Sequence, residues 1–487
     1  MRARKDEIMH QVRTFIWVFV FIAMTCISHA QEFPIAAGKN GTFLSGGAFD
    51  GTNCLLGILG DALNPGSITA QLVSGSGGLV GSRISLGVTG GWPLVAFDGS
   101  NYLMVWSSNA NTVEGQFINT SGTLVRTNFV IANNAAISGP KGGSIAFGDT
   151  TYMVVYKNND MMFGQRVSKS GALISTPTQI SSNSANDDEI AFDGTNYLVA
   201  WCDGVNDKEI YGQFVSMSGA LVGTNFLIDG GQGASDNPVV IAFDGSRYLV
   251  CFHDQSGVNS GRWNLFARFV TPSGTVSDKI TIRDYTYDPI FPMIAFDGTD
   301  YLVAWTEGFT SSGAHSKGRF FNTSGIPLGD AFTLFDTLGG KSPSVAGLLY
   351  GNNNFFVGTT RVVVSISPGG QFGFADGEVY GKIIQARTTD VNAGQANQTP
   401  REFSLFQNYP NPFNPTTTIS FALPNRSHVA LGIYNILGLK VAELVNGDFE
   451  AGYHEVKYEA SNVASGVYFY RLKAGTFLET KRLVVLH

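Results

Sequence analysis

One motif returns seven times along the chain, and this repetition constrains the fold more than any other feature of the sequence. Its clearest copy is Val95–Leu103, which reads VAFDGSNYL. A glycine marks each copy, at intervals that run from 46 residues (Gly148 to Gly194) to 53 residues (Gly245 to Gly298). The seven marker glycines are Gly51, Gly99, Gly148, Gly194, Gly245, Gly298 and Gly351. A fixed period of this size indicates a repeat architecture.

Each unit has the pattern of four antiparallel strands. In the fifth unit, the apolar runs Pro238–Phe243 and Tyr248–Phe252 are separated by Asp244-Gly245, a typical hairpin turn because type I′ turns need positive φ at both central residues. A Ser-Gly turn then joins a third and a fourth strand. Four strands per unit are typical of a propeller blade, whereas tandem sandwiches need about 100 residues each. The sequence therefore predicts an all-β fold with a seven-bladed β-propeller over residues 31–386.

The last unit lacks a fourth strand of its own. Val379–Ile384 reads as its third strand, and polar sequence follows. Phe33-Pro34-Ile35, which precedes the first unit, is similar to the end of a fourth strand such as Phe226-Leu227-Ile228. We therefore predict that residues 33–37 supply the outer strand of the last blade. This would close the ring non-covalently and remove two exposed sheet edges.

Composition agrees with a turn-rich β protein and excludes several other classes. Charged residues make up 14% of the chain, against about 25% in an ordinary soluble domain. The 59 glycines among 487 residues are also in excess. These figures exclude a coiled coil, a long helical solenoid and a disordered acidic chain. The net charge of −7 argues against a nucleic-acid partner.

The first thirty residues have the layout of a secretory signal peptide. A basic start containing Arg2 and Arg4 precedes the apolar run Phe15–Ile27, and Ser28-His29-Ala30 forms a small-x-small cleavage site. An apolar run of thirteen residues is too short for a bilayer core of about 30 Å. We predict that residues 1–30 are a signal peptide and expect no integral membrane span in the mature chain.

The end of the chain carries a second set of motifs. Residues 387–402 are polar and read as a linker. The motifs that follow are Tyr409-Pro410-Asn411-Pro412-Phe413-Asn414-Pro415, Ile433–Gly438, Gly466-Val467-Tyr468 and Lys481–Leu486. In this order they resemble the C-terminal sorting domain of cargo of the type IX (Por) secretion system, which is found in Bacteroidetes and their relatives.

The resemblance covers residues 403–487 and implies a small Ig-like β-sandwich that an outer-membrane secretion translocon recognises. It also implies export through the periplasm, followed by release or by anchoring at the outer cell surface. An ordinary Ig-like accessory domain that binds sugar is the alternative reading. The repeat units themselves resemble a DGTNYLVVW-type repeat of secreted bacterial propeller proteins, which names no substrate.

Motifs for cofactor or metal chemistry do not occur in the sequence: it has no H-E-x-x-H, C-x-x-C or EF-hand loop. We therefore predict no cofactor, no metal and no catalytic residue. The repeated aspartates are better explained as caps of hairpin turns, since one active site needs unlike residues that converge once; they are Asp50, Asp98, Asp193, Asp244 and Asp297. Cys54, Cys202 and Cys251 are interpreted as small core residues, and pairing of Cys202 with Cys251 stays open.

Residues that break the repeat are better candidates for a ligand site. Propeller ligands generally bind on the face where loops converge over the channel, and the loops of that face carry the acidic runs Asp187-Asp188-Glu189 and Asp203–Glu209. The candidate ligand-binding residues are Asp203, Asp207, Asp254, Trp263, Tyr285, Asp288 and Glu307. Acidic groups beside exposed aromatic rings suit sugars or cations, although solvated loop charges would look the same.

Two function classes remain open. The first is a secreted or cell-surface binding or adhesion module for a glycan or a protein, without catalysis. The second is a carbohydrate-active hydrolase or lyase, which would need two of these carboxylates about 5–10 Å apart across a cleft. A purely structural surface-layer role is a third option. The sequence leaves enzyme activity uncertain and favours its absence.

Overall fold

The computed structural model describes residues 31–36, 42–60, 64, 66–137, 145–203, 209–230, 239–254, 263–283, 289–310, 313–366, 372–387, 403–405, 408, 415–436, 438–461, 463–475 and 477–485. These residues form strands and turns, and none of their segments is a helix that could cross a membrane. The predicted signal peptide (residues 1–30) and nearly all of the predicted linker lie outside the described residues. The chain divides into two compact units, Met1–Arg319 with Ala331–Ala386, and Phe320–Asp330 with Arg387–His487.

Antiparallel sheets built from consecutive strands make up the first unit. The first seven strands after β1 (Phe33–Ala36) are β2 (Phe43–Phe49), β3 (Asn53–Leu59), β4 (Ser67–Ser74), β5 (Leu79–Phe97), β6 (Asn101–Ser108), β7 (Thr112–Asn119) and β8 (Leu124–Asn133). They form one continuous sheet in chain order, because the first half of the long strand β5 pairs with β4 and its second half with β6.

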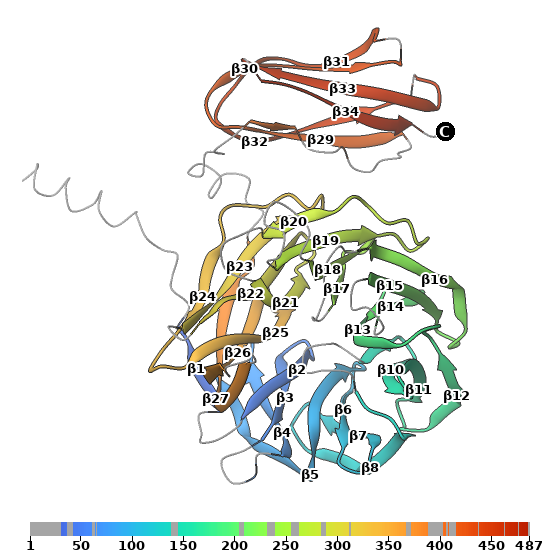
Figure 1. Cartoon of the computed structure of the whole chain (residues 1–487), viewed down its shortest axis with the longest axis vertical. Helices are drawn as coiled ribbons and strands as arrows, with labels where there is room; N and C mark the ends of the chain where they lie inside the picture. The colour runs from blue at the N-terminus through green and yellow to red at the C-terminus, as the bar shows by residue number, and fades with distance from the viewer. Residues whose placement is uncertain are drawn as a thin grey trace, which may run out of the picture. The chain divides into compact units, whose positions relative to one another are not determined.

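The remaining strands of this unit form four-stranded sheets. The first of these sheets contains β9 (Ile145–Gly148), β10 (Thr151–Asn158), β11 (Met161–Ser168) and β12 (Leu173–Gln179). The second contains β13 (Ala185–Phe192), β14 (Asn196–Asp203), β15 (Glu209–Ser216) and β16 (Leu221–Gly230). The third contains β17 (Val240–Phe243), β18 (Tyr248–Asp254), β19 (Asn264–Val270) and β20 (Ile280–Arg283). The next runs from β21 (Pro289–Phe296) to β24 (Phe332–Asp336) through β22 (Asp300–Thr310) and β23 (Gly313–Asn322). Figure 1 shows these sheets arranged around a common centre, with the first strand of each sheet innermost. This is the arrangement of a β-propeller.

The last sheet of the unit joins the two ends of the propeller segment. It consists of β25 (Ser342–Gly351), β26 (Asn354–Ile366), β27 (Phe372–Gln385) and, outermost, β1. Phe33 lies opposite Gly381 in this antiparallel pair, and Pro34 lies opposite Tyr380. The predicted contribution of an N-terminal strand to the last sheet is therefore confirmed.

In four repeat units the motif tyrosine links the unit to the one before it. These tyrosines are fully buried, and burial raises the pKa of Tyr197 to about 12. In these four units the hydroxyl donates to a backbone carbonyl of the preceding unit: Tyr102 to Asn53 (3.2 Å), Tyr152 to Asn101 (3.1 Å), Tyr197 to Thr151 (3.1 Å) and Tyr248 to Asn196 (3.2 Å). In four units the motif tyrosine therefore ties its unit to the one before it.

The aspartate of the motif caps the turn between the first two strands. Oδ1 of Asp98 accepts hydrogen bonds from the backbone N–H groups of Ser100 (2.8 Å) and Asn101 (2.7 Å). Asp50, Asp193, Asp244 and Asp297 accept the same pair of bonds in their own turns. The predicted structural role of these carboxylates is therefore confirmed.

The glycine of the first Ser-Gly turn lies against the closing sheet, and this contact gives a testable prediction. Gly77 has a φ of 91°, and a Cβ at this position would lie 2.7 Å from Cε1 of Phe33. Gly99 has a similar φ of 88° and nothing within 4 Å of its Cβ position. Gly99→Ala should therefore cost only the left-handed backbone, about 1 kcal/mol, while Gly77→Ala adds a clash and should cost about 2–4 kcal/mol. Denaturant unfolding measures both; equal losses would contradict the contact.

Two sheets around one core make up the larger part of the second unit. One sheet contains β28 (Ser404–Leu405), β29 (Thr416–Leu423) and β32 (Gly452–Glu459), and the other contains β31 (Lys440–Phe449), β30 (Ser427–Tyr434), β33 (Gly466–Ala474) and β34 (Phe477–Val485). Their facing side chains form a single buried cluster that includes Phe421, Leu431 and Tyr470. This unit is therefore also all-β.

Candidate functional site

Three of the predicted acidic candidates occupy equivalent positions in successive sheets. Asp203, Asp254 and Glu307 each follow the motif tyrosine of their unit by six residues, at or near the end of β14, β18 and β22. Only 6%, 2% and 6% of their respective surfaces are exposed. The expectation that they are loop residues is wrong, because each strand continues beyond its apolar run: Asp203 pairs with Ala185, and Glu307 pairs with Pro289.

Asp254 belongs to a buried group of charges between two sheets. Its Oδ2 lies 2.5 Å from Nζ of Lys279, which also lies 2.8 Å from Asp229 in β16 of the preceding sheet. Asp229 is 3% exposed and also binds Nε of Arg268 at 2.7 Å. The ammonium group of Lys279 further lies 4.9 Å from the ring centroid of Phe266. The negative charges of Asp229 and Asp254 are therefore compensated within the protein.

Removal of the central carboxylate of this group should destabilise the propeller. Asp229→Asn leaves Arg268 and Lys279 partly buried with one counter-charge fewer, which should lower the free energy of unfolding by about 2–4 kcal/mol. Asp336→Asn is the matched control, because the Asp336 side chain is 66% exposed and its ion pair is with the exposed His315; a loss below about 0.5 kcal/mol is expected there. Equal losses in denaturant titrations would contradict a structural role of Asp229.

Glu307 is also held by neighbouring groups. The indole N–H of Trp305 donates to its Oε2 at 3.1 Å, and Nε of Arg283 lies 3.4 Å from the same oxygen. In the last sheet the equivalent position holds Arg361, six residues after Phe355; it is 3% exposed and forms an ion pair of 2.5 Å with Glu32. In three units, those of Asp254, Glu307 and Arg361, this position therefore forms an ion pair.

The other predicted candidates do not complete a site. Trp263 is partly buried beside His253, with 6.2 Å between the ring centroids. Asp207, Tyr285 and Asp288 lie outside the described residues. Within the part of the chain that the structure describes, no group of three or more His, Cys, Asp or Glu residues could hold a metal ion. Cys54, Cys202 and Cys251 are buried, as the core interpretation predicts.

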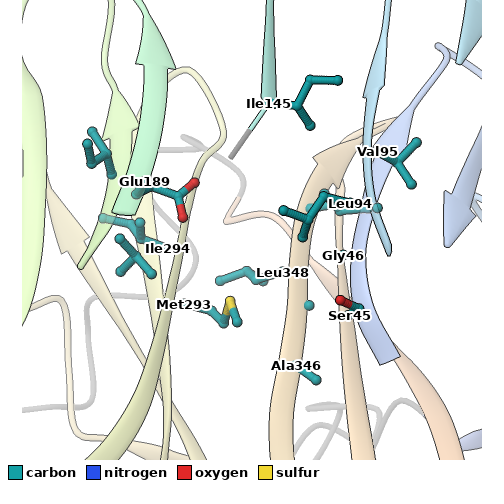
Figure 2. Close-up of a pocket in the computed structure, with 15 residues that line it drawn as sticks. Ser45, Gly46, Leu94, Val95, Ile145, Glu189, Met293, Ile294, Ala346 and Leu348 are labelled. Atoms are coloured by element: carbon teal, nitrogen blue, oxygen red, sulfur yellow. The ribbon is translucent and has the colours of Figure 1, made fainter. Parts of the chain in front are cut away.

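A cavity of about 130 Å³ lies among the innermost strands of the propeller. Its described wall is largely apolar, with Leu94, Val240, Met293 and Leu348 among the lining residues, and Glu189 is the one ionisable residue among those that the structure describes there. Figure 2 shows the Glu189 carboxylate directed into the space between these strands.

Backbone bulges decide which residues of the inner strands face this cavity. Trp92, Asp187 and Phe291 have positive φ angles of 37°, 48° and 56°, and each lies in a stretch where the register to the second strand shifts. The cavity-lining Leu94, Glu189 and Met293 follow them by two residues. Because a bulge changes the alternation of side chains, the alternation within this one strand could not distinguish Glu189 from Asp187 and Asp188.

A signal for Glu189 nevertheless exists in the repeat. The residue five positions before the marker glycine lines the cavity in six of the seven units, as Gly46, Leu94, Glu189, Val240, Met293 and Ala346. Glu189 is the one charged residue in this series. A comparison of inner-strand positions between units would have identified it.

Two of the sorting motifs have described residues at the start of strands in the second unit. Tyr409, Pro410, Asn411, Pro412, Phe413 and Asn414 lie outside the described residues. Pro415 immediately precedes β29, and Gly466, Val467 and Tyr468 begin β33. The Tyr468 hydroxyl donates to the carbonyl of Ala464 at 3.0 Å. The described motif residues thus have structural roles at the start of strands.

Comparison with protein families identifies the end of the chain. Residues 407–486 match the secretion system C-terminal sorting domain, which is the sorting domain of the type IX system. This tail implies interaction with the type IX secretion machinery and indicates export to the cell surface or the extracellular space. No curated protein matches the sequence.

Solved structures similar to the chain include several propellers. The β-propeller domain of the Trilobed protease from Pyrococcus furiosus is 10% identical, with 73% of this chain and 98% of that chain covered and a TM-score of 0.40. A puromycin-hydrolysing peptidase from Mycobacterium tuberculosis is 10% identical, with 78% and 58% covered and a TM-score of 0.45. The WD40 domain of SCAP from fission yeast is 9% identical, with 74% and 99% covered and a TM-score of 0.39.

Proposed function

We propose that this chain is a secreted or cell-surface binding or adhesion module, without catalytic activity, whose ligand is a glycan or a protein. Residues 1–30 would direct it to the periplasm, residues 31–386 would form a seven-bladed propeller, and residues 387–402 would link this to an Ig-like sorting sandwich at residues 403–487. The secretion translocon of a Bacteroidetes-like bacterium would recognise the sandwich.

The strand pairing supports the number of blades. The continuous sheet from β2 to β8 contains two four-stranded groups that share β5, and five further four-stranded sheets follow it. The two sheets around one core in the second unit support a sandwich.

The observation that carries the proposal is that candidate carboxylates are already engaged in ion pairs within the propeller. A glycosidase needs two carboxyl groups that face each other across a cleft, about 5–10 Å apart, with room for substrate between them. Asp254 is instead paired with Lys279, and Glu307 with Arg283 and the Trp305 indole, all inside or between sheets. Two of the acidic candidates thus contribute to stability, which favours a binding role over hydrolysis.

The size of the central cavity also favours binding at the surface. Sites that enclose a ligand of drug size usually measure about 300–1,000 Å³, whereas this cavity measures about 130 Å³. A sugar polymer or a protein would therefore contact the loops and strand ends around the cavity and not enter it.

The experiment that tests the proposal combines binding with turnover. The secreted protein is applied to a glycan array and to an array of surface proteins, and soluble sugar products are measured after incubation with each bound glycan. Binding without products is the expected result. Sugar release that is lost in Asp203→Asn or Asp288→Asn would contradict the proposal and establish the alternative, a carbohydrate-active hydrolase or lyase.

A further inference from the structure

One end of the four-stranded sheet in the second unit carries exposed apolar side chains. In the turn between β30 and β31, Ile436 is 72% exposed and Leu439 is 61% exposed. Val441 near the start of β31 and Val467 near the start of β33 are 39% and 40% exposed. We refer to these four residues as the hairpin patch. Exposed apolar side chains that gather in one place usually mark a site of interaction.

Strand pairing brings Val467 to the same end of the sheet as the turn. Tyr434, the last residue of β30, lies opposite Lys440 of β31 and opposite Phe469 of β33. Ile436 follows Tyr434 by two residues and Val467 precedes Phe469 by two, so both lie beyond this last pair of β30 and β33. Residues that lie opposite each other or two apart share one face of a sheet. Val467 therefore shares the outer face with Tyr434 and Phe469, while the other face packs into the core.

The fold fixes the backbone of the turn without using its apolar side chains. Oδ1 of Asn435 accepts a hydrogen bond from the N–H of Leu439 at 3.0 Å. Gly438, which has a φ of 76°, donates to the carbonyl of Asn435 at 2.9 Å. No member of the hairpin patch belongs to the buried cluster of this unit among the described residues. The turn thus holds Ile436 and Leu439 in contact with water, at a cost that the fold itself does not explain.

The charged groups beside the patch are engaged within the tail. The ammonium group of Lys440 forms an ion pair with the carboxylate of Glu443. The Arg471 guanidinium lies 4.9 Å from the ring centroid of Tyr434. Apolar contact is therefore the main interaction that this end of the sheet offers, and a matching partner surface would be apolar as well.

The size of the patch favours a transient partner over a second copy of the chain. Full burial of one aliphatic side chain removes about 60–120 Å² from water, so four of them offer at most about 500 Å². A stable interface buries about 800 Å² on each partner. The match of residues 407–486 to the sorting domain supplies a transient partner, because it implies interaction with the type IX secretion machinery.

We propose that the hairpin patch is the surface of the folded tail that the secretion machinery recognises, through an apolar surface on one of its components. Ile436 and Leu439, the two most exposed members, provide most of the contact, and Val441 and Val467 extend it. This inference rests on the proposed sorting role of the tail and assigns that role to one end of one sheet.

Secretion of the full-length chain in a host with a type IX system tests the inference. Ile436→Ser combined with Leu439→Ser should lower the extracellular protein to about a tenth of the wild-type level or less, because burial of one aliphatic side chain already changes an equilibrium by about tenfold or more. The variant retained in the periplasm should melt within about 2 °C of the wild type, since exposed side chains contribute little to stability.

Leu478→Ser is the matched control. Leu478 is also 61% exposed, and it lies in β34 opposite Lys473, at the other end of the same sheet. This variant should be secreted as the wild type is. Ile436→Val combined with Leu439→Met keeps the patch apolar and should be secreted normally too.

Several outcomes would overturn the inference. These are normal secretion of the double serine variant, a clearly lowered melting temperature of that variant, and an equal loss of secretion in Leu478→Ser or in the apolar double variant. A dimer of the secreted protein that the two serines dissociate in sedimentation analysis would assign the patch to a second copy instead. If deletion of residues 403–487 blocks secretion and the double serine variant does not, this inference fails and the sorting role stands; normal secretion of the deletion variant would refute both.

Discussion

A chain that lacks residues 403–487 is expected to remain inside the cell envelope. The tail matches a sorting domain over residues 407–486, and it has a hydrophobic core of its own, which includes Ile419, Ile433 and Leu472. The proposed signal peptide at residues 1–30 would still deliver the shortened chain to the periplasm, but the outer-membrane machinery would no longer recognise it. Cell fractionation and immunoblotting in a host with a type IX system should therefore find periplasmic protein and only background levels outside the cell.

The control for this truncation is the folding of the retained protein. The propeller unit has its own buried cores, so the periplasmic product should show a cooperative melting transition and a β-rich circular dichroism spectrum. A folded, truncated protein that reaches the medium at the level of the full chain would contradict the sorting role of the tail.

Deletion of residues 31–36 should lower the melting temperature of the propeller by about 10 °C or more. The deletion removes β1, which is the outer strand of the last sheet, with Ile35 and Ala36 each only 6% exposed. It also removes Glu32, the partner of the buried Arg361. Loss of a buried aliphatic side chain costs about 2–5 kcal/mol, and an unpaired buried charge costs about 3–5 kcal/mol. Changes of this size lower the melting temperature of a large domain by about 2 °C per kcal/mol.

Point variants separate the contributions of this strand. Ile35→Ala should lose about 2–4 kcal/mol through the buried contact, and Glu32→Gln should lose about 2–4 kcal/mol through the uncompensated Arg361. Leu173→Ala on the outer strand β12 is the control, because Leu173 is 46% exposed and should change stability by less than about 0.5 kcal/mol. A deletion variant with the wild-type melting temperature would show that β1 does not close the ring.

Repetition made the fold predictable from the sequence. The Asp-Gly turn, the buried tyrosine and the Ser-Gly turn recur because successive units repeat the same hairpins and, in four units, the same hydrogen bond to the preceding unit. The N-terminal strand could be predicted as well, since its Phe-Pro-Ile sequence is similar to the end of a fourth strand and the last unit lacked one. These features depend on local sequence and on the period, both of which are visible in one chain.

The candidate site was less predictable, because it depends on how side chains of distant units face one another. Asp203, Asp254 and Glu307 follow apolar runs and read as loop charges, yet strand pairing extends to each of them. A neighbouring sheet supplies Arg283 to Glu307, and Asp229 of another sheet shares Lys279 with Asp254. Glu189 faces the cavity because of a bulge at Asp187, and a single acidic run gives no sign of such a bulge. Which residues are brought together by strand register and by ring closure can therefore be determined only from the structure.

The mass of a bound glycan before and after incubation tests most directly whether the protein binds its ligand without cleaving it. The mature protein is purified from the medium, loaded with a glycan that it captures on the array, and the ligand is recovered and weighed by mass spectrometry after a long incubation. A binding module returns the ligand with an unchanged mass. Shorter or unsaturated products, absent when Asp203→Asn replaces the wild type, would show that the propeller is an enzyme.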